Sequence, residues 1–167
     1  LRHGRKDGRT HRIVWMWEID NGGFAEELAD FENTAFWRGI YNFVESWGDA
    51  SSGRIMNWKE GDTEKNPFVH IWDIKAKDPK AFASAQKKFT DSASSLFTDR
   101  VVGFGTYDIN KPNGATHWSL VTGKDVNDHL GLISEVQENK AFKVYIQSRG
   151  EVEQIHDFVV EVLKRYQ

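Results

Sequence analysis

The sequence predicts an α+β protein in which helices pack on antiparallel sheets. Three observations lead to this fold class. The apolar pattern of residues 68–166 follows the order βαββαβ, residues 8–60 follow the shorter order βαβ, and residues 8–40 are a weak copy of residues 114–146. Strands repeat apolar residues with a period of two and amphipathic helices with a period of about 3.6, so the two kinds of element can be told apart.

The first 60 residues are expected to form a strand, a helix and a second strand. Residues 12–20 place large apolar side chains on both faces, which predicts a strand buried on both sides. Residues 54–60 predict a second, half-buried strand. The helix between them is expected to carry one apolar stripe, formed by Phe24, Leu28, Phe31, Ala35 and Ile40.

A polar, turn-rich linker is predicted at 61–67, and the pattern restarts after it. The chain is therefore predicted to divide into a partial unit, 1–60, and a complete unit, 68–167. Residues 68–74 alternate as a strand, and Asp78 followed by Pro79 predicts a helix start, because Asp caps free backbone N–H groups and proline fits the first turn.

The later elements of the complete unit follow from similar signals. Residues 100–109 predict a strand in which Gly103 and Gly105 leave room for a bulge, a helix or a ligand to come close. Residues 116–122 predict the next strand. Asp125 caps a helix that is expected to bend or break near Glu138 and Asn139.

The last segment, 153–166, suits a strand or a short helix, and its β-branched run favours a strand. With that strand the complete unit has the βαββαβ order of a ferredoxin-like fold.

An internal repeat accounts for the two units. Shifting the chain by 106 positions gives ten identities over 38 positions, including Thr10 with Thr116 and His11 with His117. Random pairing would give roughly two or three, so a tandem duplication is predicted. The opening βαβ of the first unit is then expected to be missing. Because both copies keep their histidine, His11 and His117 are expected to be structural.

A resemblance to the dimeric α+β barrel proteins, which include antibiotic-biosynthesis monooxygenase-like and stress-responsive barrel families, lies in residues 116–145. The matching residues are Trp118, Asp125, His129, Ala141, Phe142, Lys143 and Tyr145. The resemblance covers 68–166 as a full unit and 8–60 as a partial one. It implies a tandem α+β barrel whose antiparallel sheets pack face to face, in a homodimer or as a pseudo-dimer within one chain. The first unit has Gly23 in place of His129.

The candidate catalytic residues are His70, Tyr107 and His129, and Trp72 and Trp118 join them as candidate ligand-binding residues. His70 and Trp72 share a strand face, and Tyr107 is expected on a neighbouring strand. Such a pocket could orient or deprotonate a small aromatic substrate, whereas a core histidine bonded to the backbone is the favoured alternative. The resemblance also allows His129 to line a pocket mouth or to ligate haem, but packing of His129 on its own sheet is favoured, and no cofactor is predicted.

Composition narrows the classes of function. The 22 Lys and Arg against 25 Asp and Glu argue against a nucleic-acid binder. The lack of cysteine excludes disulfides and thiolate metal sites, and it is compatible with a cytoplasmic protein. The histidines show no metal-binding spacing, so no metal site is predicted. No apolar run is long enough for a transmembrane helix.

The function predicted from the sequence is binding of a small apolar or aromatic ligand between sheet and helices. Two alternatives stay open: a cofactor-free monooxygenase or isomerase acting on a small aromatic substrate, and a structural barrel without a ligand. An enzyme predicts a pocket that contains His70, Tyr107 or His129 with a shifted pKa.

Overall fold

The computed structural model describes residues 2–3, 10–21 and 30–165 of the 167-residue chain. The chain divides into two compact units. We call Leu1–Arg12 together with Ala50–Gln167 the sheet unit, and Ile13–Asp49 the small unit. The small unit contains a 3-10 turn, η1 (Ile19–Asn21), and one helix, α1 (Asp30–Tyr41).

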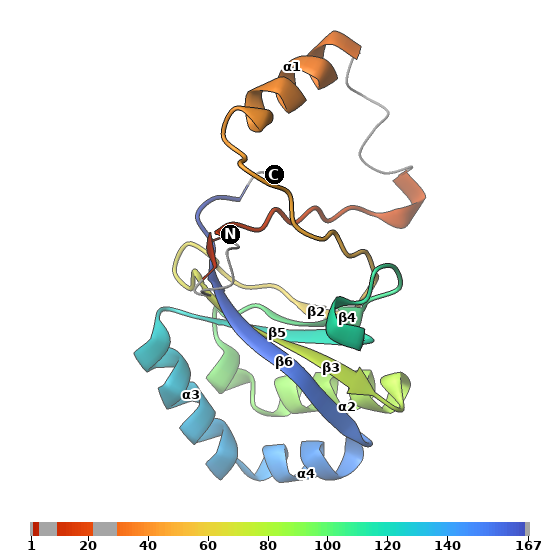
Figure 1. The fold of residues 1–167 in the computed structure, drawn as a ribbon. Coiled ribbons are helices and arrows are strands. Elements are labelled where there is room, and N and C mark those ends of the chain that lie inside the picture. The colour runs from red at the N-terminus through yellow and green to blue at the C-terminus, as the bar shows by residue number, and fades with distance from the viewer. Residues whose placement is uncertain (1, 4–9, 22–29, 166–167) are drawn as a thin grey trace. The chain divides into compact units, whose positions relative to one another are not determined.

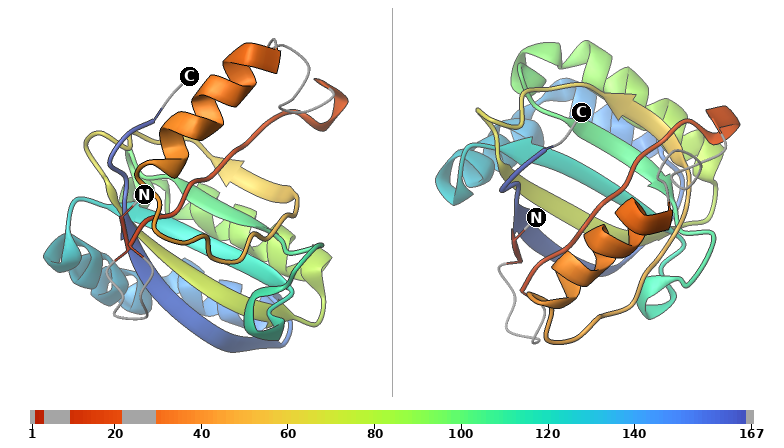
Figure 2. Two further views of the ribbon diagram at one scale, coloured as in Figure 1. Left: turned by 45° about the horizontal axis from the view of Figure 1, so that its top comes forward. Right: turned by 90° about the horizontal axis from the view of Figure 1, so that it is seen from above.

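The sheet unit consists of one antiparallel sheet with helices on one of its faces (Figures 1 and 2). The six strands lie in the order β1-β6-β3-β5-β4-β2. The strands are β1 (Arg2–His3), β2 (Ile55–Lys59), β3 (Phe68–Ala76), β4 (Val102–Thr106), β5 (His117–Gly123) and β6 (Val152–Glu161). The helices are α2 (Pro79–Ser92), α3 (Val126–Glu138) and α4 (Lys140–Ser148), with short 3-10 turns η2 (Ser94–Phe97) and η3 (Pro112–Gly114).

The predicted α+β class and the βαββαβ order of residues 68–166 are confirmed. The Asp78 side chain accepts a hydrogen bond from the Ala81 amide, and the Asp125 side chain accepts one from the Asp128 amide, so both predicted caps form. The expected break falls at Asn139, whose side chain caps α4 by accepting from the Ala141 amide. The ambiguous last segment is a strand, β6.

The predicted strand at 12–20 is wrong. Residues 12–18 take no regular structure, and η1 follows them. Alternating apolar residues indicate an extended chain, but a strand also needs a neighbour that takes up its backbone N–H and C=O groups. The predicted helix is present as α1, and its expected start, with Phe24 and Leu28, lies outside the described residues. None of the residues in α1 is buried.

The predicted division at 61–67 also needs correction. The strand β2 pairs with β4, with Trp58 opposite Gly103, so the segment 61–67 joins two strands of one sheet. The boundaries of the compact units along the chain instead fall at Arg12–Ile13 and at Asp49–Ala50. A turn-rich composition marks a loop, but it does not show whether the strands on either side of it pair with one another.

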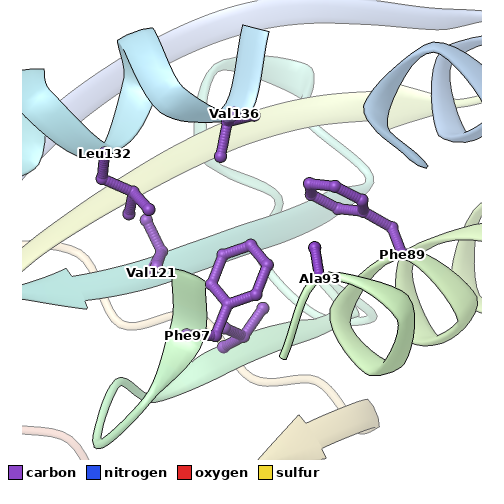
Figure 3. Close-up of a cluster of buried hydrophobic side chains, with 7 residues drawn as sticks. Phe89, Ala93, Phe97, Val121, Leu132 and Val136 are labelled. Carbon is purple, nitrogen blue, oxygen red and sulfur yellow. The ribbon is translucent and has the colours of Figure 1, made fainter. Parts of the chain in front are cut away.

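Aromatic and aliphatic side chains fill the space between the sheet and its helices. Phe89 and Phe97 meet edge to face, and Val121 and Leu132 close the cluster (Figure 3). Further along, Phe104 is fully buried against Phe82. Truncating such a phenylalanine to alanine typically costs about 3–5 kcal/mol, so this cluster holds the helices on the sheet.

The opposite face of the sheet explains the two strand glycines. A Cβ atom on Gly103 would lie 2.8 Å from the Trp58 ring, and one on Gly105 would collide with the Trp118 ring. The room that these glycines were expected to leave is therefore occupied by two indoles of the same chain.

Candidate functional site

Two histidines from different elements meet on the face of the sheet that carries the helices. The His70 side chain projects from β3, and His129 lies in the first turns of α3, which Asp125 caps. The Nδ1 atom of His70 lies 2.8 Å from the Nε2 atom of His129, a hydrogen-bond distance. The pairing of β3 with β5, which leads directly into α3, brings the two rings together.

Aromatic rings surround this His70–His129 pair. The Trp72 ring stacks on His70 with centroids 3.9 Å apart, and the Phe68 ring lies 5.7 Å from that of His129. His129 is only 5% exposed, whereas 17% of the His70 side chain remains exposed. The pair is therefore reached from solvent through His70.

The carboxylate of Asp157 favours one arrangement of protons. Its Oδ2 atom lies 3.5 Å from the Nε2 atom of His70, which favours a proton on that nitrogen. The Nδ1 atom of His70 then accepts a hydrogen bond from Nε2–H of His129. This leaves Nδ1 of His129 as an acceptor, and this buried atom has no hydrogen-bond partner among the described residues.

Both rings are neutral at neutral pH. Burial lowers the pKa of His129 to about 4, helped by the nearby His70 and by the Arg100 guanidinium. Burial also lowers the pKa of His70, but the negative charge of Asp157 opposes this shift. His70 is therefore the ring better placed to become protonated, because Asp157 stabilises its imidazolium form.

A close ion pair fixes the start of α3 beside the histidines. Arg100 donates to both oxygens of Asp128, at 2.6 and 2.8 Å, and also to the carbonyl of Thr122 on β5. The Arg100 guanidinium lowers the pKa of the Asp128 carboxyl. Because His129 follows Asp128 directly, this two-point contact restricts the position of its ring.

Tyr107 lies on the opposite face of the sheet, so the expected pocket shared by His70 and Tyr107 does not form. Its hydroxyl donates to Oδ1 of the buried Asp73, 2.7 Å away, and burial raises the pKa of Tyr107. Successive strand residues face opposite ways, which separates Asp73 and Tyr107 from Trp72 and His70. Trp118 shares the face of Tyr107, where its Nε1–H donates to the Thr106 carbonyl.

The two repeated histidines make matching local contacts. The Nδ1 atom of His117 lies 2.7 Å from the Thr116 hydroxyl, and that of His11 lies 3.0 Å from the Thr10 hydroxyl. The His117 ring also stacks on Phe104. His117 is buried, which supports a structural role for it, whereas His11 is exposed and its role stays a prediction.

The sequence singled out His70 and His129 but not their contact, since no spacing rule links a strand to a helix that starts more than fifty residues later. Phe68 could have been added, because it shares the alternating face of His70 and Trp72. No sequence pattern indicated Asp157 as a site residue, because the register of β6 against β3 cannot be read from the sequence. The Nε2 atom of His129 is turned to His70, so this nitrogen is not placed to ligate haem.

Other kinds of site find little support in the described part of the chain. Within it, no group of three or more histidine, aspartate or glutamate side chains could hold a metal ion. No helix among the described residues is long and apolar enough to cross a membrane.

No protein-family model and no curated protein sequence matches the chain. A crystal structure of a "putative monooxygenase" from Lactobacillus acidophilus NCFM is similar, with a TM-score of 0.52, 13% identity, and coverage of 77% of this chain and 59% of that one. A second structure with the same description, from Fusobacterium nucleatum subsp. nucleatum ATCC 25586, has a TM-score of 0.47, 18% identity, and coverage of 78% and 60%. The chain thus spans about three fifths of each. At such identity the first likeness shows a shared α+β fold.

Proposed function

We propose that the protein binds a small apolar or aromatic ligand beside the His70–His129 pair, and that the ligand carries an O–H or N–H group. The observation that carries this proposal is the Nδ1 atom of His129, a buried acceptor without a partner among the described residues. Leaving a buried acceptor unsatisfied costs about 1–3 kcal/mol, part of which a donating ligand would recover. The rings of Trp72 and Phe68 supply flat apolar contacts for the rest of such a molecule.

The ligand would enter from the edge where the pair meets solvent. The Asp157 side chain there is 47% exposed, and His70 lies directly behind it. The deeper space between sheet and helices is occupied by phenylalanine and tyrosine rings. A ligand of one or two rings therefore suits this edge better than a large one.

A cofactor-free monooxygenase or isomerase is the second candidate. Both reactions can begin with removal of a proton from the substrate, and the neutral His70–His129 pair can accept one. Asp157 would stabilise the resulting charge on His70. The fold shared with a structure described as a "putative monooxygenase" is compatible with this activity, although a shared fold does not establish a function.

The proposal extends to the arrangement of sheets. The face opposite the helices carries a cluster of buried apolar side chains, Val69, Ile71, Phe158 and Val160, and a second sheet, from another chain or from a duplicated unit, would extend this core. The paired Thr–His contacts at 10–11 and 116–117 support the duplication.

A binding screen tests the proposal. Hydroxylated one- and two-ring arenes would be titrated into the protein and followed by calorimetry, with the same arenes lacking the hydroxyl as matched ligands. We expect the hydroxylated compounds to bind more tightly and His129→Phe to abolish that preference. Binding of neither series would favour the structural barrel, and equal binding of both series would contradict the role of His129 as acceptor. Oxygen consumption with bound hydroxyarenes would identify the monooxygenase.

A further inference from the structure

A groove lined by apolar side chains together with Lys88, Ser92 and Ser148 lies between α2 and α4. Small side chains, Ala85 and Ala141, line it, and Phe89 and Tyr145 lie at the same groove. Its volume is about 130 Å³. Val144, which also lines the groove, is 63% exposed, so the groove presents apolar surface to solvent.

Lys88 lines this groove, and the two helices that form it are rich in basic residues. Within Pro79–Ser92 and 140–149 the chain has six basic residues and a single acidic one, Asp91. Asp91 is already paired with Lys87, at 2.9 Å. The basic residues are Lys80, Lys87, Lys88, Lys140, Lys143 and Arg149.

The small unit is acidic, whereas α2 and α4 are basic. Its 37 residues, Ile13–Asp49, contain eight acidic residues and one basic residue, Arg38. Large apolar side chains are exposed on it, among them Phe31 at 74% and Tyr41 at 59%. Asp30 and Glu32 flank Phe31 in the first turn of α1.

We propose that α1 of one chain docks into the α2–α4 groove of a second copy of this chain. An aromatic side chain such as Phe31 would fill the groove, and Asp30 and Glu32 would meet the lysines of α2 and α4. Amphipathic helices bind grooves in this way, through apolar anchors at helical spacing and complementary charges at the edge.

This contact uses different surfaces on the two copies, so it is head-to-tail. It is separate from the packing of two sheets, which would bury the face opposite the helices. It also does not involve the His70–His129 pair, so it can hold or fail independently of ligand binding.

Charge reversal in the full-length protein tests the contact. Sedimentation velocity over a concentration series would compare the wild type with Lys88→Glu/Lys143→Glu on α2 and α4 and with Asp30→Lys/Glu32→Lys in α1. We expect each double variant to associate at least about tenfold more weakly than the wild type, and high salt to weaken the wild type as well. The control is Lys111→Glu, an exposed residue outside both helices, which should associate as the wild type does.

Mixing the two double variants supplies the decisive comparison, because it pairs the reversed helix with the reversed groove. Restored association in the mixture supports the proposal. A wild type that is monomeric at every concentration overturns it. Association that neither variant weakens also overturns the proposal and assigns the contact to the sheet face. Circular dichroism of each variant serves as the control that it is folded.

Discussion

The Nδ1 atom of His70 and the Nε2 atom of His129 lie 2.8 Å apart across the boundary between sheet and helices. Only one of the two nitrogens can carry the shared proton when both rings are neutral. When both rings are charged, two N–H donors face each other and the contact is lost, which makes the pair sensitive to pH.

Acid should destabilise the protein through His129. Its pKa is about 4 in the folded protein and about 6.5 when unfolded, so the unfolded state binds the proton first as the pH falls. The stabilisation is fully present above about pH 6.5 and is lost as the pH falls towards 4, by about 1–3 kcal/mol. Urea unfolding at a series of pH values would show this slope.

In the same unfolding series His129→Phe should flatten the slope between pH 6.5 and 4. The variant keeps a ring of similar size at the site, so it removes the titration with little loss of packing. An unchanged slope in the variant would assign the acid sensitivity to other groups.

Asp157→Asn should lower the pKa of His70. The carboxylate raises this pKa against the effect of burial, and an amide carries no charge to do so. Titration of the His70 ring protons by NMR measures the change. Asp91→Asn, which alters an exposed carboxylate paired with Lys87, serves as the control and should leave His70 as it is.

Gly103→Ala should destabilise the sheet by about 1–3 kcal/mol, because the added methyl group would press on the Trp58 ring. Gly131→Ala is a matched control: no atom lies within 4 Å of its Cβ position, and alanine favours helix over glycine by about 1 kcal/mol. Thermal unfolding should therefore shift in opposite directions for the two variants. A Gly103→Ala protein as stable as the wild type would mean that Trp58 is free to move aside.

Tyr107→Phe should destabilise the fold without affecting the histidine pair. It removes one donor from the buried Asp73, at a cost of about 1–3 kcal/mol. Because Tyr107 lies on the other face of the sheet, the NMR signals of His70 and His129 should stay in place. Displaced signals would show that the two faces are coupled.

The sequence was informative where local chemistry decides structure. Asp78 and Asp125 predict helix starts because a cap depends only on the few residues that follow it. The glycines of β4 indicate that a neighbouring group comes close, because a residue without a side chain leaves room at its own position. The prediction of a strand at 12–20 was wrong because an apolar pattern contains no information about a pairing partner.

The candidate site shows the same limit. Strand alternation placed His70 and Trp72 together, but it could not place Tyr107, whose face depends on the registers of β3, β5 and β4. The contact between His70 and His129 depends on how α3 packs on β3, and the contribution of Asp157 depends on the register of β6. These are long-range relationships, and a single sequence carries no local signal for them.

The most direct test of the account is the nitrogen chemical shift of His129 Nδ1 during titration with a hydroxylated arene. The account predicts that in the free protein this atom is an unprotonated nitrogen, and that its resonance moves towards that of a hydrogen-bonded acceptor as the ligand binds. A His129 Nδ1 that is already protonated, or one whose shift does not change while the ligand binds, would contradict it.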